Sequence, residues 1–186
     1  MFPFTGQLQQ HILDAQQQSL GRVLGSHQSN LVLAWRGKDE RNQYRYAMHG
    51  VDAPVALTEQ EQQNIRDHKP LDYGFFGRGV YFTQYFGYGA EYIDKYPGSP
   101  LLLSWVAMGN VYPVTENCAT LPYEQHLHGK PCKPGFDSHY VLVHGELNQP
   151  ITSTSDTPKV DEIVVFDPAQ VSTQPPTQPP TTHQCA

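Results

Sequence analysis

The sequence has 186 residues, of which 38% are hydrophobic and 11% aromatic; this suits one compact domain with an apolar core and argues against global disorder. With 12 Lys and Arg residues against 18 Asp and Glu residues, the formal charge is -6. That balance argues against a broad phosphate-binding surface and against duplex nucleic acid as a routine partner.

The first part of the chain is predicted to form a helix followed by a hairpin. Apolar residues recur on one face of residues 7–24, which predicts a helix that stops at Gly25. Residues 31–35 form an apolar strand, and residues 44–48 alternate in polarity. We expect these two strands to pair across the polar turn at residues 37–42.

A second helix precedes a glycine-rich loop. Thr58, with Glu61 three residues later, forms a capping-box pattern that predicts a helix over residues 58–67. Residues 68–79 are rich in glycine and aromatic residues and are predicted to be a loop, and residues 80–82 a short strand.

The second half is predicted to consist mostly of strands. A helix over residues 89–94 comes first, residues 117–138 form a long polar loop, and residues 172–186 form a disordered Pro/Thr/Gln-rich tail. The predicted strands cover residues 100–107, 111–114, 139–144 and 162–166. Several strands with few helices and no regular alternation predict an α+β fold with antiparallel sheets.

Residues at the edges of these segments offer groups that suit chemistry on NAD. Breaking the bond between ribose and nicotinamide passes through an oxocarbenium-like transition state, which a fixed carboxylate such as Glu162 stabilises. A flat ring such as Tyr81 or Tyr92 can stack on nicotinamide. His49 offers a group for the other ribose, and the backbone of Gly50 can approach the carboxamide closely.

Three motifs in chain order carry a family resemblance. They are His49-Gly50, then Phe76-Gly-Arg-Gly-Val-Tyr-Phe82 with Tyr92 eleven residues past Tyr81, and then Glu162-Ile-Val-Val-Phe-Asp-Pro-Ala-Gln-Val171. Over residues 44–171 the chain resembles the catalytic domain of the poly(ADP-ribose) polymerases, the His-Tyr-Glu branch of the ADP-ribosyltransferases. The resemblance implies split antiparallel sheets with a few flanking helices, in one catalytic domain over residues 1–171.

The resemblance also implies a role for each site residue. His49 would bond the adenine-side ribose, and the Gly50 backbone would hold the nicotinamide carboxamide. Tyr92 would stack under the nicotinamide, with Tyr81 close by in the same pocket. Glu162 would bond the nicotinamide ribose and drive transfer, which makes it the central catalytic group.

Some positions extend the pattern and others depart from it. Arg78, in a loop over the NAD, would meet its phosphates. The family usually has a serine where this chain has Gly89, and often a lysine where it has Tyr88. Loss of the serine hydrogen bond would weaken NAD binding by on the order of 1 kcal/mol. Val160, two residues before the catalytic glutamate, disfavours the arginine-specific branch.

The expected function is therefore that of an NAD-dependent ADP-ribosyltransferase, a pentosyltransferase that uses NAD as co-substrate and releases nicotinamide. The acceptor is expected to be a protein side chain, with nucleic-acid ends and small molecules left open. Glu162 suits single transfer and also chain elongation, because it could activate a ribose hydroxyl as a general base; single transfer is favoured. The alternatives are a module that holds NAD or ADP-ribose without turnover, for which Gly89 is a reason, and an NAD glycohydrolase.

Cysteine content and apolar runs bear on location. The three cysteines are few and odd in number, so they do not form a disulfide framework. Such a count fits a reducing compartment. The first residues show no secretory signal, and no apolar run is long enough to cross a membrane. We therefore predict a cytoplasmic or nuclear protein, monomeric and without a membrane partner.

One cluster in the long loop contains possible metal ligands. Cys118, His126, His128 and Cys132 are of types that bind zinc, but the His-Leu-His spacing is not a common finger pattern. The prediction is therefore that no metal is bound and that the cluster is a polar loop.

Overall fold

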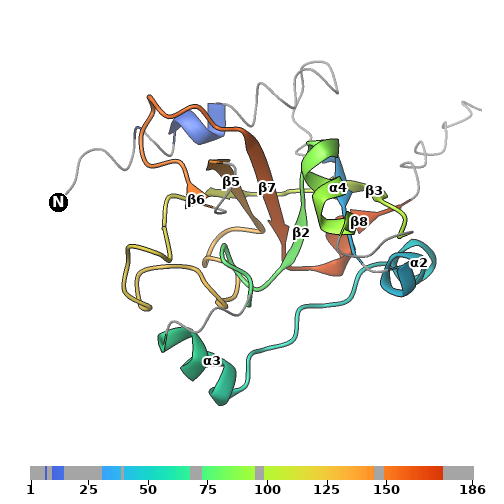
Figure 1. The fold of residues 1–186 in the computed structure, drawn as a ribbon, viewed down its shortest axis with the longest axis horizontal. Coiled ribbons are helices and arrows are strands. Elements are labelled where there is room, and N and C mark those ends of the chain that lie inside the picture. Colours follow the sequence, from blue (N-terminus) through green and yellow to red (C-terminus); the bar gives the residue numbers. More distant parts are fainter. Residues whose placement is uncertain are drawn as a thin grey trace, which may run out of the picture.

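The computed structural model describes residues 7, 10–14, 31–38, 40–67, 73–94, 99–144 and 149–173. Within these ranges the chain forms two β-sheets with short helices around them (Figure 1). This confirms the predicted α+β class with few helices. Every strand pair is antiparallel except one, in which β4 (Val111–Pro113) runs parallel to β5 (Ser138–His144).

The smaller sheet contains strands from both ends of the described chain. Its order is β1 (Leu31–Arg36), β3 (Leu102–Ala107) and β8 (Val171–Ser172). The predicted disordered tail therefore starts too early, because Val171 and Ser172 pair with β3. Residues 174–186 of that tail lie outside the described residues.

The larger sheet has β7 (Val160–Val165) at its centre. β7 pairs on one side with β2 (Val80–Phe82) and on the other with β5, as Figure 1 shows. β4 lies beyond β5, and β6 (Gln149–Pro150) also pairs with β5. The predicted strands at residues 80–82, 111–114, 139–144 and 162–166 are confirmed within a few residues.

Helix α2 (Glu40–His49) overturns the predicted hairpin. Residues 44–48 are helical, and β1 pairs with β3 instead. The burial pattern explains the error: Gln43 and Tyr46, three positions apart, are buried at 1% and 8% exposure, whereas Tyr44 and Met48 are 60% and 77% exposed. The alternating polarity of residues 44–48 therefore does not mark the buried face of a strand. The buried positions are three residues apart, which fits the period of a helix.

The other helices agree more closely with the prediction. α3 (Glu59–Arg66) has Thr58 as N-cap, and the complete capping box with Glu61 is present. α4 (Phe86–Asp94) begins three residues before its predicted start. Of the predicted N-terminal helix, the described residues 7 and 10–14 are helical, and the rest lies outside the described residues.

The core has two parts, one on each face of the larger sheet. Val32, Ala34 and Val106 of the smaller sheet pack against Ile163 and Val165 of the larger one in the first part. The second part covers the opposite face and contains alternate strand residues together with loop residues. These include Phe76, Tyr112, Leu127, Val141 and Val164.

The predicted long loop is confirmed: between Pro113 and Ser138, a segment the structure describes throughout, the chain has no helix or strand. No helix among the described residues has the length and apolar character needed to cross a membrane.

Candidate active site

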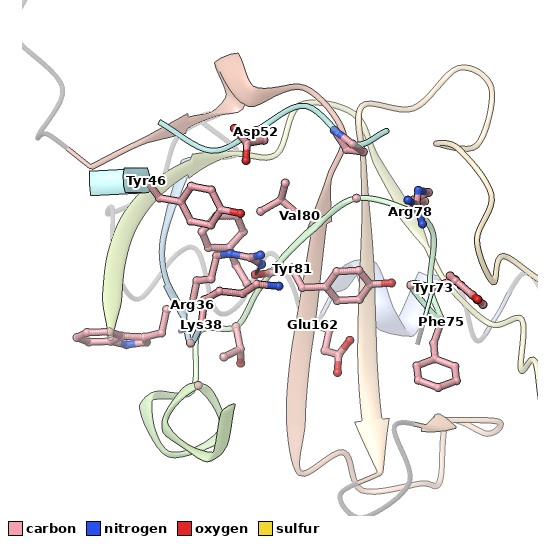
Figure 2. Close-up of a pocket in the computed structure, with 18 of the residues that line it drawn as sticks. Arg36, Lys38, Tyr46, Asp52, Tyr73, Phe75, Arg78, Val80, Tyr81 and Glu162 are labelled. Carbon is pink, nitrogen blue, oxygen red and sulfur yellow. Dashed lines mark hydrogen bonds between the residues drawn. The ribbon is translucent and has the colours of Figure 1, made fainter. Parts of the chain in front are cut away.

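A pocket of about 580 Å³ lies beside the point where the two sheets touch. There Trp35 and Thr83 exchange backbone hydrogen bonds of 2.7 and 2.9 Å, which join the ends of β1 and β2. The walls come from the end of β1, residues 52–55, the turn at residues 73–79, β2, α4 and β7. Figure 2 shows the side chains that line it.

Glu162 enters the pocket from the central strand of the larger sheet. Its neighbours Asp161 and Ile163 point to the opposite face, because successive side chains of a strand alternate. Glu162 is only 3% exposed, and its Oε1 accepts a 2.5 Å hydrogen bond from the Tyr88 hydroxyl of α4. The carboxylate is thus held on a rigid strand, at the wall of a cavity large enough for a ligand.

Tyr81 stands next to Glu162 in Figure 2, on the adjacent strand β2. Its hydroxyl accepts a 2.9 Å hydrogen bond from the Phe76 amide and donates a 2.7 Å bond to the Gly77 carbonyl. The ring lines the pocket while the hydroxyl holds the turn above it. Tyr81 therefore lines the same pocket as Glu162, and its hydroxyl is engaged with backbone groups; its predicted place beside the nicotinamide stays a prediction.

The turn at residues 73–79, which the Tyr81 hydroxyl binds, requires glycine at several positions. Gly77 has φ +116°, and a Cβ there would lie 2.7 Å from the Phe166 ring. Gly74 has φ +90°, and a Cβ there would lie 2.4 Å from the Gly77 carbonyl oxygen. At Gly79 a Cβ would lie 2.5 Å from Cγ1 of Val164, so the turn packs directly onto β7.

Arg78, between these glycines, lies at the rim of the pocket. Its Nε donates a hydrogen bond to the Val55 carbonyl, and its backbone amide donates a 2.7 Å bond to the Lys130 carbonyl. In Figure 2 its guanidinium lies on the side of Tyr73 and Phe75. Arg78 thus joins three loops and places a positive charge in the pocket wall, and its predicted contact with the NAD phosphates stays a prediction.

Two further cations, Arg36 and Lys38, were missed by the sequence analysis. Both line the pocket, and Figure 2 shows their side chains extending toward the space between Tyr46 and Tyr81. The Nη1 of Arg36 donates a 2.8 Å hydrogen bond to the Tyr81 carbonyl, and its guanidinium lies 5.5 Å from the centre of the Tyr46 ring. Both residues follow the first predicted strand within three positions. This place in the sequence could have indicated them, because loops that follow strands often carry binding residues.

His49 and Gly50 do not join this group. His49 is exposed at the last position of α2, and neither residue is among those that line the pocket. Gly50, with φ +79°, ends the helix, and its amide donates a 2.9 Å bond to the Tyr46 carbonyl. The assignment assumed that a strand would carry His49 to the site, whereas the segment is a helix whose end faces solvent.

The two predicted positions on α4 have different outcomes. Gly89 lines the pocket, where a Cβ would lie 3.0 Å from Cβ of Trp35, so its small size lets α4 pack closely against β1. Tyr92 is within α4, but its side chain lies outside what the structure describes. Its predicted stacking role stays a prediction.

The possible zinc ligands do not converge. Nδ1 of His126 accepts a 3.1 Å bond from the His128 amide, Nε2 of His128 accepts a 3.3 Å bond from the Tyr73 amide, and the Cys132 thiol donates to the Phe136 carbonyl. No group of three His, Cys, Asp or Glu side chains within the described ranges could hold a metal ion. The two histidines are buried and support the loop beside the pocket.

Asp161 braces the site from the other face of β7. Its Oδ1 accepts 2.9 Å bonds from the Thr83 hydroxyl and the Gln84 amide, and its Oδ2 accepts one from Tyr140. Burial raises the pKa of Asp161 to about 6, although these three donors oppose the shift. The segment that starts α4 is therefore tied to the strand that carries Glu162.

His139 supports the turn from below. Nδ1 lies 2.6 Å from the Phe76 carbonyl, and Nε2 accepts a 2.9 Å bond from the Lys133 amide. The neutral ring with its proton on Nδ1 satisfies both contacts. Burial lowers the pKa of His139, which favours the same neutral form.

No protein-family model matches this sequence, and a search of curated proteins finds no significant match. The site must therefore be interpreted from its own geometry.

Proposed function

We propose that this protein is an NAD-dependent ADP-ribosyltransferase with the fold of the poly(ADP-ribose) polymerase catalytic domain. The observation that carries the proposal is that Glu162 lines the same pocket as Arg78 and Tyr81, which come from a motif about 80 residues earlier in the sequence. The same pocket contains two more cations and several aromatic rings. A buried carboxylate, aromatic walls and positive charge together suit a dinucleotide with a diphosphate.

The chemistry follows from these groups. The bond between the ribose carbon and the nicotinamide nitrogen breaks, its electron pair leaves with nicotinamide, and positive charge develops on the ribose. Glu162 stabilises that charge, in the way carboxylates act in glycoside hydrolysis. A nucleophile of the acceptor, which we propose to be a protein side chain, then forms a bond to the same carbon and releases its proton to a base. Arg36, Lys38 and Arg78 bind the diphosphate electrostatically and take no part in bond breaking.

A Glu162→Gln variant tests the proposal. With NAD labelled in its adenylate part and a cell lysate as acceptor source, the native protein is expected to label macromolecules and release nicotinamide. The variant should lose about 100- to 1000-fold in rate, because it lacks the charge while its shape is kept. Glu91→Gln, on the exposed surface of α4, is the matched control and should retain full activity. Undiminished transfer by the Glu162→Gln variant would contradict the catalytic role assigned to Glu162.

A binding module that holds ADP-ribose without turnover is the second candidate. The exposed position of His49 favours it, because one residue of the expected catalytic trio is absent from the pocket. Calorimetric binding of NAD without nicotinamide release would support this candidate. Nicotinamide release without labelled macromolecules would instead indicate a hydrolase.

A further inference from the structure

The Tyr88 hydroxyl of α4 donates a hydrogen bond to the Glu162 carboxylate. The two oxygens are 2.5 Å apart, and the residues are 9% and 3% exposed. An ionised carboxylate only accepts hydrogen bonds, so the phenol is the donor. A hydrogen bond from an O–H group to a charged oxygen is stronger than one between two neutral groups.

Tyr88 reaches Glu162 because α4 is fixed at two points. At its start, the Gln84 amide and the Thr83 hydroxyl are bound by Asp161, the residue next to Glu162 in β7. One turn further on, Gly89 lets the helix approach Trp35 of β1 to near van der Waals contact. The position of Tyr88 beside the carboxylate is therefore set by contacts that α4 and the segment before it make with β1 and β7.

We propose that Tyr88 is a positioning residue for the reaction of Glu162. Its hydroxyl fixes the rotation of the carboxylate toward the ribose that occupies the pocket. It also favours the ionised state, which burial alone would disfavour. This inference rests on the proposed function, since it concerns the step that Glu162 performs there.

A Tyr88→Phe variant removes the hydroxyl and keeps the ring. We expect kcat for nicotinamide release to fall about 10- to 100-fold, as for loss of one hydrogen bond to a charged group, with KM for NAD changed less than about threefold. The acid limb of the pH–rate profile should move to higher pH, because the ionised carboxylate has lost a donor. Tyr85→Phe, on the exposed surface just before α4, is the matched control and should change neither rate nor profile.

A double variant separates positioning from general damage. If Tyr88 acts through Glu162, then adding Tyr88→Phe to Glu162→Gln should lower the residual rate no further. Should Tyr88→Phe fail to fold, a difluorotyrosine at position 88 keeps the packing and, being the stronger donor, should move the acid limb to lower pH.

The outcomes distinguish the two proposals. Native-like kcat and pH profile in a folded Tyr88→Phe protein, or additive losses in the double variant, would overturn the positioning role while leaving the proposed function intact. An unmoved acid limb in the difluorotyrosine protein would do the same. Absence of nicotinamide release from the native protein would overturn both.

Discussion

Two neighbouring carboxylates, Asp161 and Glu162, lie on opposite faces of one strand and have different surroundings. Asp161 faces the core side, where it receives bonds from Thr83, Gln84 and Tyr140. Glu162 faces the pocket and receives the Tyr88 hydroxyl. The alternation of a strand thus places one acid in the core and the other in the wall of the pocket.

The raised pKa of Asp161 predicts a pH-dependent stability. Because the pKa is about 6 in the folded chain and 3.8 ordinarily, the folded state favours the protonated acid. The associated stability is fully present below about pH 4 and is lost as pH rises through 6, on the order of 3 kcal/mol in all. Asp161→Asn should remove this loss, which urea unfolding between pH 4 and 7 would measure.

The difference in pH-dependent stability between the native protein and Asp161→Asn reports the contribution of Asp161 alone. Glu91→Gln, with an exposed carboxylate removed, should keep the native pH dependence. Parallel stability curves for the native protein and Asp161→Asn would contradict the prediction.

At the residue scale, the sequence predicted the groups that lie within local motifs. The Gly77-Arg-Gly79 pattern with Tyr81 and the strand beginning near Glu162 are short-range features, and all these residues line or support the pocket. Arg36 and Tyr88 were not predicted, because their roles depend on neighbours brought together by tertiary folding. No local sequence pattern indicates a hydrogen bond between residues as far apart as Tyr88 and Glu162.

At the scale of elements, the turn at residues 73–79 connects both parts of the site. The Tyr81 hydroxyl holds it from the pocket side and His139 holds it from the larger sheet. The turn also carries Arg78, so its shape decides where that charge lies. Local rules predicted a loop there, but the positive φ angles of Gly74 and Gly77 are properties of the folded turn.

Substitution of Gly77 should disturb the turn. A Cβ there would lie 2.7 Å from the Phe166 ring and 3.1 Å from Nδ1 of His139, at φ +116°. Gly77→Ala is therefore expected to cost about 1–3 kcal/mol of stability and to weaken ADP-ribose binding. Thermal unfolding and calorimetric titration would measure the two effects.

Gly87 is the matched control for that experiment. It lies in α4, and a Cβ there would meet nothing within 4 Å. Gly87→Ala should be neutral or stabilising by up to about 1 kcal/mol, since alanine favours a helix. Equal losses in the two variants would contradict the steric explanation.

The same scale shows where pattern reasoning failed. Capping signals predicted α3 correctly because a capping box is a contact between residues three apart. Residues 44–48 were predicted as a strand because alternation over five residues also fits part of a helix. Burial of Gln43 and Tyr46 decides between the two, and it depends on the rest of the fold.

At the scale of the whole molecule, charge is distributed unevenly. The chain carries a formal charge of -6, yet Arg36, Lys38 and Arg78 line a single pocket. Of the two acids there, Asp52 is paired with Arg45, and Glu162 is bound by Tyr88. The pocket is therefore a local positive region in an acidic protein, which suits capture of a small anion rather than of a polyanion.

This distribution predicts a salt-dependent affinity. ADP-ribose should bind several-fold more weakly at about 500 mM than at about 50 mM salt, because counterions screen the pocket cations, while adenosine binding should change little. Lys38→Gln should reduce both the affinity and its salt dependence. Lys159→Gln makes the same change in net charge at an exposed position away from the pocket and should leave both unchanged. Equal effects of the two substitutions would contradict a local charge effect.

The central position of β7 has a consequence for biosynthesis. β2 (Val80–Phe82) is synthesised long before β7, the strand with which it pairs. The edge of β3 that pairs with Val171 and Ser172 is likewise synthesised long before those residues. A nascent chain on the ribosome therefore exposes unpaired apolar strand edges until residues 160–172 have been translated. The pocket forms only when the last described strands emerge, so the growing polypeptide has no bound ligand to stabilise it before that point.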